Sequence, residues 1–577
     1  MNPPESQWTD CGSGVRLERG VCCRMSDGGE LVSDHYYPPD GGSNPTLLMR
    51  QPYGRDIAST VVYAHPIWFA RRGYNVVIQD VRGRGDSGGE FYPFRHEGRD
   101  GAETIAWLRT RPEGNGRIGM YGFSYQGMTQ LLAAAEQPEG LLCIAPGMTA
   151  CDLYHGWFYN QGALRLASSL GWGVQMMKAD ARRKQLREAS DRLEQAWANL
   201  PGQNTFLPFR EHPALHGLDL PEYVLDWFDH DRPGEYWTAL DVGQSLERIA
   251  VPALHLSGWY DTYLKGSVDG FLALSRAPSD GESAAFARKH QYLIAGPWQH
   301  IPWGDRIGTM DLGSEASLDT DAILLRWFNH WLKDSGEFNG EPRVRHFVLG
   351  ENCWRRAESF PTDTNHVLYL HSSGKANSRK GEGQLSTITP VTDEPCDIFV
   401  YDPEVPVLAP GGLAAASGPF DQATLELGNN LLVYTSPPLA TPLRVFGVPR
   451  VSLYCSTSSS NTDLTAKLVR VRPDQTAEFI CIGVARSSWL FAGSGYRADT
   501  VHRWDFDLEP TSFLLAVGER LRLEVASSAF PLYDRNPSTE VPSCRATSWD
   551  WRRSTQIVFH NASHPSALHL PVSEAVE

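Results

Sequence analysis

The first third of the chain alternates strand-like and helix-like segments. Short runs of apolar and β-branched residues occupy 46–53, 74–81 and 117–124, which is typical of buried strands. Residues 98–110 and 125–137 instead carry apolar residues at helical spacing. Strands that alternate with helices in this way predict a mostly parallel sheet with helices on both faces.

The strand signal fades from about residue 152 to residue 246. Within this stretch, residues 176–200 have the pattern of one charged amphipathic helix that ends at Pro201-Gly202. The signals for two strands and a tryptophan-containing helix then return, at 251–261, 290–300 and 321–334. The pattern therefore predicts a helical segment inserted into the sheet domain.

Beyond residue 360 the pattern changes to alternating strands separated by turn residues, with no convincing long helix. This pattern indicates a sandwich or jelly roll. The clearest strand-like segments are HVLYLHSS, VSLYCSTSS, LTAKLVRVRPD, AEFICIGVARSS, ERLRLEVASS and TQIVFHN. A chain of 577 residues is also too long for one domain. We expect an α/β core in two parts, 1–151 and 247–360, a helical cap insertion at 152–246, and a C-terminal all-β jelly-roll domain at 361–577.

Composition and charge narrow the choice of partners. The formal net charge of −16 repels polyanions, which speaks against nucleic acid or an anionic membrane as the main partner. The N-terminus lacks the pattern of a signal peptide and no apolar run approaches a membrane span, so we expect a cytoplasmic protein. The ten cysteines form no C-x-x-C pair, which favours buried thiols over a metal site or disulfide framework.

The stretch GRGDSGGEF (83–91) matches two known motifs at once. Its G-x-G-x-x-G part is a dinucleotide fingerprint only if a helix starts within it, but Pro93 and a further glycine intervene. Its GDSGG part resembles a protease motif, yet only His35 and His65 precede Ser87, neither in a suitable context. We interpret the stretch as a glycine-rich turn and expect no cofactor.

A better candidate for chemistry is Ser124 in MYGFSYQGMTQ. It lies between a predicted strand and a predicted helix and is flanked by Gly122 and Gly127, which is the context of a nucleophile elbow. The segment departs from the usual G-x-S-x-G because Gln126 takes the place of the second glycine. An ordinary serine in a strand-to-helix turn is the alternative.

Two later residues complete a catalytic set in the order Ser, Asp, His. Asp261 follows the apolar run ALHLSGWY, and His300 follows YLIAGPWQ. His300 is expected to take the Ser124 proton and Asp261 to fix the tautomer of His300. His290 precedes its strand and His346 lies within one, so both fit less well.

With these residues in place, the chain resembles the CocE/NonD hydrolases, the cocaine-esterase-like group of the X-Pro dipeptidyl-peptidase superfamily. The resemblance spans nearly the whole sequence, and G-x-S-Y-x-G is this family's form of the elbow. It implies an α/β-hydrolase core with an inserted helical cap and a C-terminal jelly roll. The matching motifs include RQPYGRD, VVIQDVRGRGDSGGEF, GMYGFSYQG, SGWYD, AGPWQH and VASSAFPLYDRNPST.

The resemblance also implies further site residues. The family holds its oxyanion with the backbone N–H that follows the serine and with a tyrosine hydroxyl, which match Tyr125 and Tyr53 here. A phenol donates one directed hydrogen bond without acting as a nucleophile at neutral pH. Trp157, Trp172 and Tyr263 match the aromatic residues that line the family's acyl pocket.

We therefore expect a cofactor-free serine hydrolase that cleaves a small-molecule carboxylic ester or amide through an acyl-enzyme. An Xaa-Pro dipeptidyl peptidase and an α-amino-acid ester hydrolase or β-lactam acylase are the alternative enzymes, and both need acidic residues to hold a substrate ammonium. A binding protein on a hydrolase scaffold is the non-enzyme alternative. We further expect the last domain to wall the active site, and a homodimer stays open.

Overall fold

The computed structural model describes residues 7–11, 14–56, 60–277, 281–308, 310–411 and 417–573. The N-terminal stretch used to predict localisation lies largely outside these residues. Within them, no helix is both long enough and apolar enough to cross a membrane. All ten cysteines are free thiols. Six of them are buried, as expected, whereas Cys11, Cys22, Cys353 and Cys396 are only partly buried.

The core is a mixed sheet in which eleven strands of the described residues follow the order β1-β2-β3-β5-β4-β6-β7-β10-β11-β14-β15. Its parallel part is formed by β4 (Asn44–Gln51), β5 (Asn75–Asp80), β6 (Gly114–Phe123), β7 (Leu141–Gly147), β10 (Ala253–Tyr260), β11 (Gln291–Gln299) and β14 (Val344–Val348). Antiparallel strands extend both edges, namely β1 (Gln7–Asp10), β2 (Arg16–Arg24) and β3 (Glu30–Tyr37) on one side and β15 (Cys353–Ala357) on the other. The predicted α/β fold class is confirmed.

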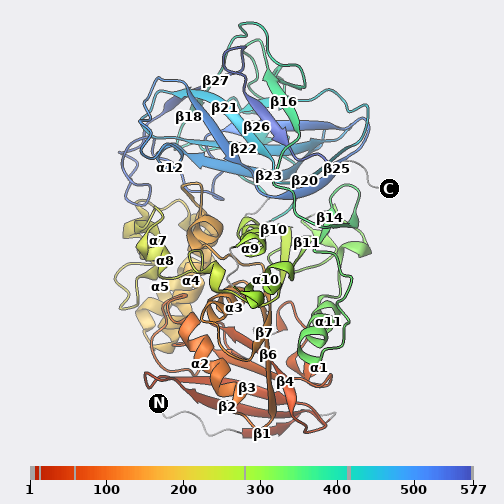
Figure 1. Cartoon of the computed structure of the whole chain (residues 1–577). Coiled ribbons are helices and arrows are strands. Elements are labelled where there is room, and N and C mark those ends of the chain that lie inside the picture. The colour runs from red at the N-terminus through yellow and green to blue at the C-terminus, as the bar shows by residue number, and fades with distance from the viewer. Residues whose placement is uncertain are drawn as a thin grey trace.

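Helices cover both faces of the sheet (Figure 1). α2 (Glu97–Arg109) and α3 (Tyr125–Ala135) pack together on one face, whereas α1 (Pro66–Ala70) and α11 (Thr320–Lys333) share an apolar cluster on the other. The remaining core helices are α9 (Leu264–Arg276), which follows β10, and α10 (Glu282–Lys289). Side chains at helical spacing on α11, including Trp327 and Phe328, are fully buried, which explains why this segment covers a sheet.

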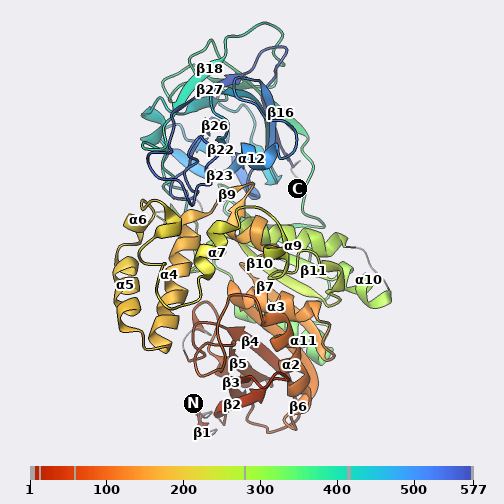
Figure 2. The ribbon, with the colours of Figure 1, turned by 90° about the vertical axis from the view of Figure 1, so that its left-hand side faces the viewer.

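The inserted segment forms a helical cap beside the core (Figure 2). Its helices are α4 (Leu166–Arg183), α5 (Arg187–Ala198), α6 (Leu200–Gln203), α7 (Tyr223–Asp229) and α8 (Glu235–Thr238). The single helix expected over 176–200 is wrong, because the chain turns back at Gln185, whose φ is +58°. Folding back lets Leu193 join Met177 in one apolar cluster, and Pro201 lies inside α6 instead of ending a helix.

The last part is a β domain (Figure 1). Its larger sheet contains β16 (His366–His371), β17 (Gln384–Ser386), β18 (Asp397–Tyr401), β19 (Leu432–Thr435), β21 (Arg450–Thr457), β22 (Asp463–Val471), β23 (Ala477–Arg486), β24 (His502–Asp507), β26 (Arg520–Ala526), β27 (Ser554–Phe559) and β28 (Ala567–Leu570). β20 (Leu443–Gly447) pairs with β25 (Thr511–Leu515). All six predicted strands are present, and the short α12 (Ser487–Leu490) is the one α-helix among the described residues of this domain.

The β domain is bonded to the cap through buried groups. Arg165, which precedes α4, donates from Nη2 to Glu509 Oε1 at 2.7 Å, and both side chains are almost fully buried. The backbone N–H of Leu166 donates to the carbonyl of Leu532 at 3.1 Å. These contacts hold the cap against the β domain. The bounds of the four segments given above stay a prediction.

The GRGDSGGEF stretch forms a tight turn after β5. Gly85 has φ +49°, and a Cβ there would lie 2.0 Å from Asp80 Oδ2, so only glycine fits. The Ser87 hydroxyl is fully buried, donates to the Asp80 carbonyl at 2.7 Å and accepts from the Val32 N–H at 2.8 Å. The next helix begins only at Glu97. These contacts make the stretch a structural turn.

Candidate active site

Ser124 lies on a sharp turn between β6 and α3. Its φ of 61° and ψ of −129° are unusual for a residue with a side chain, and such strain is typical of functional turns. Glycines make the turn possible, since a Cβ on Gly122 would lie 2.5 Å from Gln126 Cβ and one on Gly127 would lie 2.7 Å from Thr149 Cβ. The predicted elbow geometry is therefore present at Ser124.

Gln126 fits the turn because its side chain folds back. Its Oε1 accepts a hydrogen bond from the Phe123 N–H at 3.2 Å, and the residue is 1% exposed. Close packing against Thr149 falls one position later, at Gly127. This explains why the second glycine stands one place further along than in the usual motif.

The structure brings Ser124, His300 and Asp261 together. His300 Nε2 lies 3.0 Å from Ser124 Oγ, and His300 Nδ1 lies 2.7 Å from Asp261 Oδ1. The strand register explains the second contact. Tyr260, the last residue of β10, pairs with Gln299, the last residue of β11, so Asp261 and His300 follow side by side. Asp261 is fully buried, whereas the His300 side chain is 29% exposed. Such a chain of contacts can carry a proton from a hydroxyl to an imidazole.

The two competing histidines lie elsewhere. His290 follows α10, and its Nδ1 lies 2.8 Å from the Phe286 carbonyl oxygen. His346 is buried in β14, with Nδ1 2.8 Å from Ser512 Oγ and its ring stacked on Phe446. Both have structural contacts away from Ser124.

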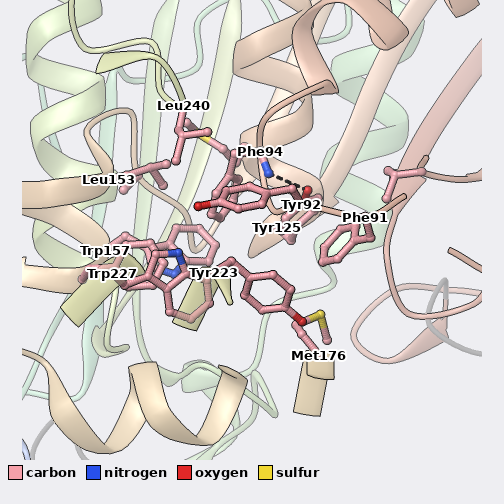
Figure 3. Packing of buried hydrophobic residues seen from close by; sticks show 14 of the residues in the cluster. Phe91, Tyr92, Phe94, Tyr125, Leu153, Trp157, Met176, Tyr223, Trp227 and Leu240 are labelled. Atoms are coloured by element: carbon pink, nitrogen blue, oxygen red, sulfur yellow. Dashed lines mark hydrogen bonds between the residues drawn. The ribbon is translucent and has the colours of Figure 1, made fainter. Parts of the chain in front are cut away.

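The two candidate oxyanion donors approach Ser124 from different elements. Tyr125 is the first residue of α3, so its backbone N–H has no partner within the helix. Its hydroxyl points into the core, where it accepts from the Phe94 N–H at 2.9 Å (Figure 3). It also donates to Glu97 Oε1 at 2.8 Å. The aromatic packing around Phe94 and Tyr125 fixes the start of α3, so only the Tyr125 backbone is available to a substrate.

The Tyr53 hydroxyl is the other candidate donor. It accepts a hydrogen bond from Trp172 Nε1 at 3.3 Å and lines the same cavity as Ser124. Burial raises the pKa of Tyr53, although the Trp172 and Ser124 side chains act in the opposite direction. The phenol therefore keeps its proton at neutral pH and can donate it in a hydrogen bond.

A cavity of about 580 Å³ opens over these groups, a size suited to a small organic substrate. Its surface is mainly apolar and aromatic, with a few uncharged polar side chains. Among the described residues that line it there is no Asp, Glu, Lys or Arg, and His300 is the only titratable base. The lining residues include Tyr53, Phe123, Ser124, Gln126, Trp172, Gln175, Trp197, Tyr263, Gln299, His300, Ile301 and Leu532.

The three predicted pocket aromatics occupy two layers. Trp172 and Tyr263 line the cavity, and the Tyr263 ring stands edge-on to His300 with centroids 5.2 Å apart. Trp157 is not among the described lining residues. It is 2% exposed and lies among buried aromatic residues (Figure 3). It stacks on Tyr263 with ring centroids 4.1 Å apart, so it supports the wall from behind.

Several lining residues were not identified from the sequence. Phe123 and Ile301 adjoin Ser124 and His300, so their position next to the motifs was a usable signal. Trp197 of the cap and Leu532 of the β domain carry no such signal, because only tertiary packing brings them to the cavity. The presence of Leu532 agrees with the expectation that the last domain walls the site.

Comparisons with known proteins agree with this architecture. The sequence model of the X-Pro dipeptidyl-peptidase (S15 family) matches residues 27–302, and that of the X-Pro dipeptidyl-peptidase C-terminal non-catalytic domain matches residues 336–569. Cocaine esterase of Rhodococcus sp. is 33% identical over 96% of this chain and 98% of its own.

Two solved structures share the fold over nearly the whole chain. An aminopeptidase from a Thaumarchaeota archaeon has a TM-score of 0.81 at 23% identity and covers 100% of this chain and 99% of its own. An α-amino acid ester hydrolase has a TM-score of 0.79 at 24% identity and covers 98% of both chains.

Proposed function

The chain belongs to the CocE/NonD hydrolases of the X-Pro dipeptidyl-peptidase (S15) family and is a serine ester hydrolase, and from this premise we propose that it cleaves uncharged carboxylic esters with an apolar or aromatic acyl group through an acyl-enzyme on Ser124. The observation that carries the proposal is the Ser124–His300–Asp261 contact chain beneath a cavity whose described lining bears no carboxylate. Membership of this hydrolase family argues against the alternative of a binding protein without activity.

In the proposed reaction, Ser124 Oγ attacks the ester carbonyl carbon while His300 Nε2 takes the hydroxyl proton. The resulting imidazolium gives this proton to the leaving alkoxide, and the alcohol departs. A water molecule then attacks the acyl-enzyme with His300 again as base, which releases the acid and restores Ser124. Asp261 holds Nδ1 of His300, and its negative charge favours the imidazolium in both steps.

The oxyanion of each tetrahedral intermediate is assigned to the Tyr125 N–H and the Tyr53 hydroxyl. One donor comes from the backbone of α3 and the other from the loop after β4. The hydrogen bond from Trp172 supports this role, since it orients the Tyr53 oxygen.

The acyl group is assigned to the space between Trp172 and Tyr263. Two aromatic surfaces favour a flat or branched apolar group over a polar one. A substrate ammonium would lose hydration there without meeting a carboxylate among the described lining residues, and burying an unpaired ion costs several kcal/mol. This disfavours the amino-acid ester hydrolase and dipeptidyl-peptidase alternatives.

Three methyl esters that differ only in one substituent of the α-carbon test the substrate class: phenylacetate (hydrogen), phenylglycine (ammonium) and N-acetylphenylglycine (acetamido). We expect kcat/KM for phenylacetate to exceed that for the phenylglycine ammonium form by at least about tenfold, with the N-acetylated ester between them. Faster turnover of phenylglycine, together with an inert N-acetyl ester, would instead reveal an amine-binding site. Xaa-Pro anilides measured beside the esters test the peptidase alternative.

A further inference from the structure

The mouth of the catalytic cavity exposes apolar side chains to solvent. Among the described residues of the core and the cap, four large apolar side chains are exposed, namely Val61, Trp197, Phe286 and Ile301. All except Phe286 line the catalytic cavity, and these three are between 40% and 46% exposed. Exposed apolar side chains that gather around a cavity typically mark a surface that binds a ligand. We call Val61, Trp197 and Ile301 the apolar mouth.

The chemistry of the leaving group places the alcohol part of an ester at this mouth. His300 Nε2, which lies 3.0 Å from Ser124 Oγ, gives its proton to the departing alkoxide, so the alcohol must lie beside His300. Ile301 directly follows His300, lines the cavity and is exposed. The acyl group is assigned instead to the space between Trp172 and Tyr263. The two halves of the ester therefore meet different surfaces.

One face of α4 lines the cavity, with residues at a spacing of three or four that form one row on the helix. They are Ser168, Gly171, Trp172 and Gln175. Gly171 leaves this row open, since a Cβ there would meet nothing closer than Leu200 Cδ1, at 3.8 Å. A glycine in a helix interior costs stability relative to alanine. The space that it leaves beside Leu200 can hold an alcohol group of several carbon atoms.

Trp197 offers an oriented aromatic surface at the mouth. It belongs to α5, and Lys178 Nζ lies 4.7 Å from the centroid of its ring. Lys178 is itself held by Glu194, whose Oε2 lies 3.1 Å from Nζ. An ammonium held against an indole ring by cation–π attraction helps to fix the orientation of the ring. The rest of the ring surface can then pack against an apolar group.

The same ammonium disfavours a second cation at the mouth. Glu194 is shared between Lys178 and Arg182, so this group has two positive charges and one negative charge. The described residues that line the cavity include no carboxylate to offset the excess positive charge. A cationic alcohol would be repelled, and it would compete with Lys178 for the Trp197 ring. An uncharged alcohol avoids both effects.

We propose that the apolar mouth, together with Gly171 and Leu200, binds the alcohol part of the substrate and selects a bulky, uncharged, apolar alcohol. Trp197 is the specificity-determining residue of this subsite. The inference rests on the proposed function, and it concerns the half of the ester that the acyl pocket does not contact.

Three esters of phenylacetic acid test the proposal, because they share one acyl group and differ only in the alcohol: methyl, 3,3-dimethylbutyl and choline. The last two alcohols have nearly the same shape, but only choline is charged. We expect kcat/KM for the 3,3-dimethylbutyl ester to exceed that for the methyl ester by about tenfold or more, since each buried methylene group is worth roughly fourfold in binding. The choline ester should fall at least about threefold below its neutral isostere.

Trp197→Ala should lower the preference for the 3,3-dimethylbutyl ester over the methyl ester by about fivefold or more. The rate of deacylation should not change, because all three esters form the same phenylacetyl-enzyme and the alcohol has already left. Trp549→Ala is the matched control, since this exposed tryptophan of the β domain is not among the described residues that line the cavity, and it should keep the wild-type preference.

Gly171→Leu is the second variant if Trp197→Ala does not fold. Leucine fills the open space and favours the helix more than glycine does, so the same loss of preference is expected in a folded protein.

The inference is overturned if the methyl ester is hydrolysed as fast as the 3,3-dimethylbutyl ester, or if the choline ester matches its neutral isostere. It is also overturned if the folded variant keeps the wild-type preference, or if Trp197→Ala slows deacylation, which would place Trp197 on the acyl side. Failure to hydrolyse any of the three esters would overturn the proposed function, and this inference with it.

Discussion

Replacing Tyr53 by phenylalanine tests the assignment of the oxyanion donors. The change removes one oxygen atom and keeps the ring, so packing in the half-buried site is preserved. In the structure the hydroxyl accepts from Trp172 Nε1 at 3.3 Å, which leaves its own O–H to donate to a substrate oxyanion. Because burial raises its pKa, the phenol is protonated at neutral pH.

The expected loss follows from the number of donors. Two donors are assigned to the oxyanion, and removing one such donor costs roughly 10²–10³ in kcat, or about 3–4 kcal/mol. The Tyr125 N–H and the Ser124–His300–Asp261 contacts remain, so activity should fall without disappearing. KM should change little, because the ground-state carbonyl binds the donor more weakly than the oxyanion does.

The assay is steady-state hydrolysis of methyl phenylacetate, with thermal unfolding to show that the variant is folded. Trp172→Phe is a matched comparison that leaves the phenol in place but removes its orienting bond, and about tenfold loss or less is expected. A Tyr53→Phe enzyme with kcat within about threefold of wild type would refute the assignment.

Three further predictions concern the acid, the interdomain ion pair and pH. Asp261→Asn should lower kcat by about 10⁴ in the same assay, because the amide cannot stabilise the His300 imidazolium, and a loss below about tenfold would contradict this role. Arg165→Met should lower the free energy of unfolding in denaturant by about 3–5 kcal/mol, because it leaves Glu509 buried and unpaired. The double variant with Glu509→Leu should recover most of this loss, and a failure to recover it would contradict the pairing. Burial raises the pKa of Asp397, but hydrogen bonds, led by that from His560, outweigh burial and hold this pKa below the usual 3.8. Asp397→Asn should therefore be clearly less stable than wild type at pH 7, and the difference in unfolding free energy should shrink as the pH falls below 3.8. A difference that stays constant with pH would contradict this.

The main features of the site could be predicted because they depend on local sequence and strand order. Ser124 stands between a clear strand and a clear helix, and Asp261 and His300 each follow an apolar run. Parallel strands end at the same edge of a sheet, so these residues were expected to meet. Their hydrogen-bond distances, however, depend on the β10–β11 register, which the pattern did not specify.

Other features depend on packing between distant segments. The turn at Gln185 has neither glycine nor proline, so the charged pattern of residues 176–200 extended through it without a break. Leu532 reaches the catalytic cavity only because the β domain docks on the cap. Trp157 was expected on the pocket surface but lies behind Tyr263, a distinction of one layer that aromatic identity alone cannot make.

The central claim, that Ser124 is an activated nucleophile, is tested most directly by intact mass after incubation with a fluorophosphonate. We predict a single adduct on the wild-type chain and none on Ser124→Ala, because only a serine hydrogen-bonded to a base reacts readily with this probe. No adduct on folded wild type, or an adduct that persists on Ser124→Ala, would contradict the account.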